Sequence, residues 1–162
     1  MGLDITAYKK LSKIEKPELD RDGYPVRWDT EVQLRTDYTE KDFPGRTEGL
    51  EHVAVYSYAE EHRFRAGSYS GYNSWRNELA KLAGYTSADD CWNNHTSGPF
   101  YELINFSDCE GVIGPVVSAK LAKDFADYRE KAEIIGGWFF DAYQDWEKAF
   151  TMAADNGAVS FH

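Results

Sequence analysis

The first third of the chain shows the residue pattern of short β-strands separated by turns. Over residues 3–8, apolar and polar side chains alternate, which is typical of a strand with one buried face. Three further short strands are predicted at residues 32–35, 53–58 and 63–65. Asp22-Gly23 and the region around Pro44-Gly45 have the composition of turns.

The remainder of the chain is predicted to be mainly helical. Tyr72, Trp75 and Leu79 recur at helical spacing, and similar apolar stripes follow later in the chain. Residues 85–98 are rich in Asn, Asp, Ser and Thr and are expected to form a polar loop. The expected fold is a single α+β domain over residues 1–162, with N-terminal antiparallel strands and turns, three to four amphipathic helices and a possible final strand. The expected helices and the final strand are residues 72–82, 99–106, 118–132, 138–154 and 158–161.

Composition and charge narrow the classes of function. The 162 residues include 28 Asp and Glu against 18 Lys and Arg, for a net charge of −10. Residues 1–81 are nearly neutral, with 15 acidic and 13 basic side chains, whereas residues 82–162 have 13 acidic and only 5 basic ones. Direct binding of nucleic acid is therefore disfavoured. No apolar run is long enough for a membrane span and no signal peptide is recognised, so a cytoplasmic protein is expected.

The most suggestive segment for binding covers residues 63–76. Two glycines and several hydroxyl side chains lead into the predicted helix, whose N-terminal N–H groups would favour an anion. Nearby arginines could pair with a phosphate or carboxylate, and aromatic rings could stack on a base. The candidate ligand-binding residues are Arg63, Arg65, Ser68, Tyr69, Ser70, Tyr72, Asn73 and Arg76. A structural alternative is that Ser70 caps the helix, the glycines form the bend and the rings belong to the core.

A second candidate patch is Asp108, Cys109 and Glu110. A calcium loop of the helix–loop–helix type is not expected here, because alignment of Gly111 with the invariant glycine leaves Phe106 at the first ligand position. Cys109 could in principle act as a nucleophile, although a small buried thiol is the more common role of such a cysteine. The histidines show no metal-ligand spacing, so no metal, cofactor or catalytic residue is predicted, and both cysteines are expected to be free thiols.

Four literal strings resemble a set of small proteins encoded by tailed bacteriophages and prophages. The strings are residues 1–8 (MGLDITAY), 64–72 (FRAGSYSGY), 106–111 (FSDCEG) and 153–162 (AADNGAVSFH). The resemblance implies a phage origin and the cytoplasm of an infected bacterial host, but no activity or catalytic residue. It favours accessory roles, among them the inhibition or decoying of bacterial defence.

Three functional hypotheses follow from these observations. The first is a non-enzymatic binder of a small anionic, nucleotide-like ligand at residues 63–76. The second is an acidic inhibitor that docks on a basic host protein involved in defence or nucleic-acid binding, because the charge of residues 82–162 would attract a positive surface. The third is a small hydrolase, for which no motif is present. No membrane partner is expected, and a homo-oligomer is possible.

Overall fold

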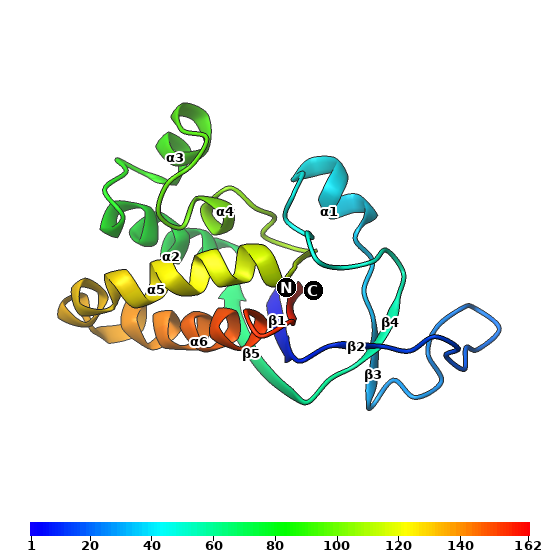
Figure 1. Ribbon diagram of the computed structural model, residues 1–162. Coiled ribbons are helices and arrows are strands. Elements are labelled where there is room, and N and C mark those ends of the chain that lie inside the picture. The colour runs from blue at the N-terminus through cyan, green and yellow to red at the C-terminus, as the bar shows by residue number, and fades with distance from the viewer.

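The centre of the molecule is a four-stranded antiparallel sheet. The computed structural model describes residues 1–162 and orders these strands β5-β1-β7-β6. The sheet brings the start of the chain between two later segments, so that both termini lie together in Figure 1. The α+β class expected from the sequence is confirmed. The strands are β1 (Gly2–Lys9), β5 (Glu60–Ser68), β6 (Gly111–Ile113) and β7 (Ala158–Phe161).

Helices cover one face of this main sheet. The apolar positions of β1, namely Leu3, Ile5 and Ala7, are buried against them, which is the burial that the alternating pattern predicts. The two longest helices, α5 and α6, form an antiparallel hairpin that extends along one side of the molecule (Figure 1). The helices of this region are α2 (Tyr69–Leu82), α3 (Ala88–Asn94), α4 (Tyr101–Ile104), α5 (Pro115–Ile135) and α6 (Gly137–Ala153).

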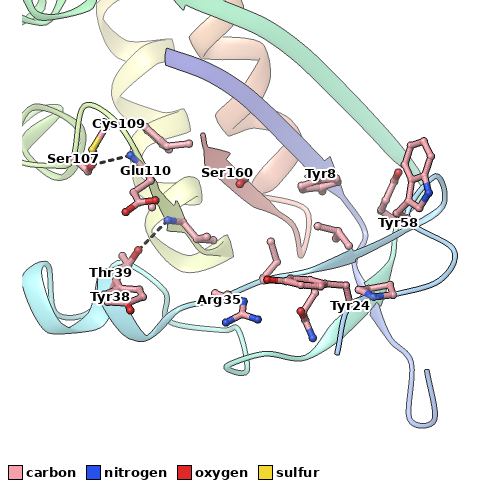
Figure 2. A pocket seen from close by; sticks show the side chains of 18 of the residues that line it. Tyr8, Tyr24, Arg35, Tyr38, Thr39, Tyr58, Ser107, Cys109, Glu110 and Ser160 are labelled. Atoms are coloured by element: carbon pink, nitrogen blue, oxygen red, sulfur yellow. Dashed lines mark hydrogen bonds between the residues drawn. The ribbon is translucent and has the colours of Figure 1, made fainter. Parts of the chain in front are cut away.

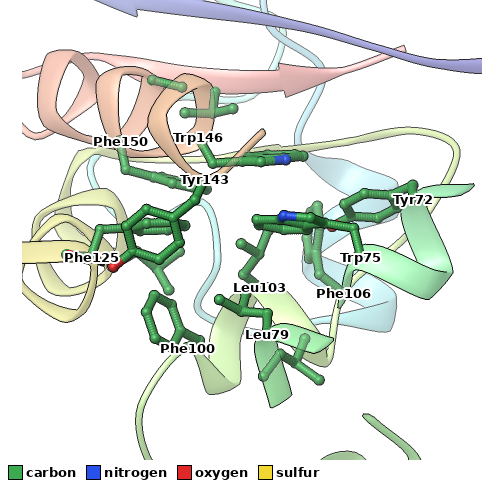
Figure 3. Close-up of a cluster of buried hydrophobic side chains, with 14 of the residues drawn as sticks. Tyr72, Trp75, Leu79, Phe100, Leu103, Phe106, Phe125, Tyr143, Trp146 and Phe150 are labelled. Carbon is green, nitrogen blue, oxygen red and sulfur yellow. Dashed lines mark hydrogen bonds between the residues drawn. The ribbon is translucent and has the colours of Figure 1, made fainter. Parts of the chain in front are cut away.

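The core between helices and sheet is built largely from stacked aromatic rings (Figure 3). The Trp146 ring lies 5.7 Å from the Trp75 ring, and the two planes differ by 16°. The Phe150 ring lies 5.9 Å from Trp146, again nearly parallel to it. Rings of this size contribute large apolar areas, and their stacking adds to the stability gained by burial.

The opposite face of the main sheet is partly covered by a second, smaller sheet and a short helix. This sheet has the strand order β2-β4-β3, and it lies to the right of the main sheet in Figure 1. A separate small cluster of buried side chains, including Tyr8, Leu34 and Tyr56, packs between the main sheet and the smaller sheet. The elements are β2 (Ser12–Lys13), β3 (Glu31–Gln33), α1 (Asp37–Asp42) and β4 (Val55–Ser57).

Several local expectations need correction. The polar segment 85–98 contains α3, because the Ser87 side chain accepts a hydrogen bond from the backbone N–H of Asp90 and so caps a helix. One side of α3 is also buried, at Ala88 and Cys91. The short elements β2, α1 and β6 had no sequence signal, and the expected strand at residues 63–65 is one part of the longer β5.

Candidate functional site

A groove of about 740 Å³ lies between the polar face of the main sheet and the segment formed by β3 and α1. β1 and β7 present Tyr8 and Ser160 to it, on the face opposite the helices. Figure 2 shows these strands on one side and the chain around Arg35 on the other. The loop that precedes β6 contributes Ser107, Cys109 and Glu110 at one end. The groove is therefore lined by residues from both sheets.

Aromatic side chains give the groove its most distinctive character. Trp28 is 79% exposed, and Tyr38 and Tyr24 are also exposed although they line the groove. Deeper in the groove, the rings of Tyr8 and Tyr58 are 4.9 Å apart. Burial raises the pKa of Tyr8 to about 12, so its phenol is neutral near pH 7. Exposed rings beside a cavity are suited to stack on a planar ligand.

Arg35 is the one arginine with an exposed or half-exposed side chain that has no carboxylate within 4.0 Å. Its guanidinium lies 5.4 Å from the centre of the Tyr24 ring, over the groove. Arg63 also lines the groove, but it pairs with Glu61 at 3.1 Å. Three acidic residues, Glu31, Asp42 and Glu110, are part of the same lining, so the groove has both charges.

The residues predicted at the helix entrance are divided between several environments. Arg63 reaches the groove, whereas Arg65 pairs with Asp4 at 3.1 Å and does not line it. Ser68 caps α2 by accepting a hydrogen bond from Gly71, so the expectation that Ser70 is the cap is wrong. Tyr69 and Ser70 lie in the first turn of α2, outside the groove lining.

Tyr72, Asn73 and Arg76 contact the core and the loop before β6. Tyr72 is fully buried among the stacked rings, and burial raises the pKa of its phenol. Asn73 donates a hydrogen bond to Asp108 at 2.8 Å, which joins the two segments selected from the sequence. The buried Arg76 guanidinium donates to the carbonyl oxygen of Phe106 at 2.6 Å. This network holds α2 against the loop, and a smaller pocket of about 300 Å³ lies beside Arg76 and Asp108.

The second predicted patch contributes only partly to the groove. Cys109 and Glu110 line it, and Ser107 accepts hydrogen bonds from the backbone N–H groups of both residues. Asp108 points instead to Asn73. Both cysteines are free, as expected; Cys109 is exposed, while burial raises the pKa of Cys91 to about 11.

Sequence reasoning missed the residues that dominate the groove, namely Tyr24, Trp28, Arg35 and Tyr38. They lie in turns and short elements where no periodic pattern predicts burial. The signal available in the sequence was that these aromatic residues cluster in a segment rich in turn-forming and charged residues. Such a segment has no regular buried face, so large rings in it are left at the surface.

Comparisons with protein families, with curated proteins and with solved structures give no match to this chain. No helix combines the length and apolar character needed to cross a bilayer. No group of three or more His, Cys, Asp or Glu side chains is placed to hold a metal ion.

Proposed function

We propose that this protein is a non-enzymatic binder of a small anionic, nucleotide-like ligand, and that the ligand occupies the groove between the main sheet and the β3–α1 segment. The observation that carries the proposal is the Arg35 guanidinium, which is exposed, lines the groove and has no carboxylate partner. A ligand phosphate would supply the missing partner, through charge-assisted hydrogen bonds to the planar guanidinium.

Size and lining support a ligand with both a ring and an anionic group. A groove of about 740 Å³ has the volume of typical small-molecule sites. The ring would stack on the exposed side chains of Tyr24 and Trp28, and the anionic group would lie near Arg35. Arg63 would add a second positive charge, although it shares its own with Glu61.

Replacement of Arg35 by alanine tests the proposal. We expect Arg35→Ala to weaken nucleotide binding by roughly 10- to 100-fold, because a hydrogen bond to a charged group is lost. Because this side chain is exposed and makes no ion pair, the melting temperature of the free protein should change little. Binding would be measured from the quenching of tryptophan fluorescence by a panel of nucleoside monophosphates.

Arg65→Ala is the control, because Arg65 is an exposed arginine of β5 that pairs with Asp4 and does not line the groove. The control variant should bind as the unmodified protein does. If no nucleotide in the panel changes the fluorescence or the melting temperature of the unmodified protein, the ligand-binding proposal is lost.

The phage origin that the resemblance implies would give this binding a biological role. A protein that captures a nucleotide in the cytoplasm of an infected bacterium lowers the free concentration of that nucleotide. Where the nucleotide is a signal in host defence, capture would counter the defence without any catalysis. The depletion depends on the amount of protein relative to the signal, as for any stoichiometric binder.

An acidic protein-binding inhibitor is the second proposed function, favoured by the tip of the α5–α6 hairpin. Ile134 is 86% exposed and Trp138 59% exposed, an unusual concentration of apolar surface. The basic residues Lys123 and Arg129 of this hairpin already pair with acids of the hairpin. The exposed acids near the tip that make no ion pair are Glu130, Glu133 and Asp141. Lys131 is also exposed near the tip and makes no ion pair, so the three acids leave a net negative charge beside the apolar side chains. Such a tip would fit an apolar cleft with a basic rim.

Charge reversal at the tip tests this second function. The double variant Glu133→Lys/Asp141→Lys is expected to abolish salt-sensitive co-purification with a basic host protein, because attraction becomes repulsion. Glu48→Lys is the control, since Glu48 is exposed and unpaired but lies in the loop after α1. Co-purification that survives the double reversal would contradict the inhibitor proposal.

A further inference from the structure

Two buried acceptor oxygens in the groove lining have no hydrogen-bond donor. They are Oε2 of Glu31 and Oε1 of Gln33, both on β3. Because the two residues are separated by one position in a strand, their side chains leave the same face. Buried polar atoms are nearly always hydrogen-bonded in proteins, so two adjacent exceptions need an explanation.

The Gln33 side chain is held in one orientation by its own amide nitrogen. Nε2 donates to the carbonyl oxygens of Gly23 at 3.2 Å and Val53 at 3.4 Å. A flipped amide would turn its oxygen toward these two carbonyls, which cannot donate. Oε1 is therefore fixed as a free acceptor.

The Glu31 carboxylate is similarly short of donors. Its residue is only 9% exposed, and the nearest cation is Arg27, with Nη1 3.9 Å from Oε1. That distance is too long for a hydrogen bond. Oε2 has no partner at all, although a shielded carboxylate oxygen is costly to leave without one.

We propose that these two oxygens recognise the base of the bound nucleotide and that the base is guanine. This inference rests on the proposed ligand-binding function. The Watson–Crick edge of guanine carries two adjacent donors, the ring N1–H and the N2 amino group, which Glu31 and Gln33 would accept. Adenine places a ring acceptor beside its amino group, and uracil places carbonyls on both sides of its N–H. Each of these would leave one oxygen unpaired or set it against another acceptor.

The two oxygens are shielded from solvent in the free protein, so the base reaches them only after a covering side chain rotates. Trp28, which is 79% exposed and belongs to a turn, also lines the groove. Once the base is bound, the Trp28 indole would stack on its plane. Binding is therefore expected to change the fluorescence of this tryptophan, and Trp28→Phe should remove most of the signal.

The test compares guanosine, inosine and adenosine monophosphates, measured by calorimetry on the full chain. Guanosine monophosphate should bind roughly 100-fold more tightly than adenosine monophosphate, because adenine can pair with only one of the two oxygens and sets its ring acceptor against the other. Inosine monophosphate keeps the N1–H but lacks the amino group, so it should lie roughly tenfold below guanosine monophosphate.

Substitution of the acceptors should remove the preference. Glu31→Gln keeps the shape of the side chain, breaks no hydrogen bond and should reduce the preference for guanine to near unity. Glu110→Gln, which changes another acid of the same groove, should leave the preference intact. Melting temperatures of both variants would show that each is folded, and Gln33→Leu provides a second variant should Glu31→Gln fail to fold.

The outcomes separate the two levels of the proposal. If all three nucleotides bind equally and Arg35→Ala weakens each of them, the ligand-binding function stands and the guanine assignment is wrong. If adenosine monophosphate binds more tightly than guanosine monophosphate, the assignment is likewise overturned. If none of the three binds, both proposals fail together.

Discussion

Replacing Trp146 with alanine is expected to lower the free energy of unfolding by about 4 kcal/mol. The indole is 1% exposed and lies within 6 Å of the rings of Tyr72, Trp75, Phe150 and Phe161. Its removal takes away the stacking contacts and leaves a cavity that rings on separate elements cannot fill without moving. Among single substitutions in this chain, this one is expected to have one of the largest effects on stability.

Urea unfolding followed by circular dichroism would measure this loss. Trp138→Ala is the matched control, because Trp138 belongs to the same helix but is 59% exposed, and it should cost less than about 1 kcal/mol. A loss below about 2 kcal/mol for Trp146→Ala would mean that the aromatic core is less tightly packed than the ring distances indicate.

Gly157→Ala is expected to destabilise the fold by about 3 kcal/mol through a backbone collision. A Cβ atom at this position would overlap the carbonyl oxygen of Tyr8 and would lie 2.9 Å from the Cα of Ala153. Both obstacles are backbone atoms of β1 and α6, so neither can rotate away. The main sheet would have to separate at the start of β7.

Gly84→Ala distinguishes a collision from an effect of backbone conformation. Gly84 has a φ of +99°, and no neighbouring atom lies within 4 Å of the position that a Cβ would take. Alanine at this position is therefore unfavourable only because of the positive φ. It should cost about 1 kcal/mol. Thermal unfolding of both variants would give the comparison, and equal losses would rule out the collision at Gly157.

The sequence predicted those parts of the fold in which burial follows a regular period. β1, α2, α5 and α6 have apolar positions at strand or helix spacing, and all four lie close to their expected positions. The short elements were not predictable in this way. β6 has three residues and is defined by its pairing with β7, and α3 depends on a serine cap within an otherwise polar segment.

The site was less predictable than the fold, for a related reason. The glycine and hydroxyl pattern at residues 67–71 identifies a capped helix start, and that is its visible role in the structure. The groove instead combines side chains from β1, β3, α1 and the loop before β6, which only the tertiary fold brings together. Arg63 is the one predicted arginine that reaches it; Arg65 leaves the same face of β5, but it pairs with Asp4 and lies outside the groove lining.

The central position of β1 also affects the order in which the molecule can fold during synthesis. β1 leaves the ribosome before both of its partner strands, and one of its edges can pair with β5, but the other edge must wait for residues 158–161. The backbone hydrogen bonds between Asp4 and His162 join positions separated by almost the whole chain. Until then, one edge of β1 is unpaired and can associate with other chains. The slow step of folding is therefore expected to be the docking of β7 on β1. As long as the edge of β1 that pairs with β7 is exposed, aggregation competes with this docking.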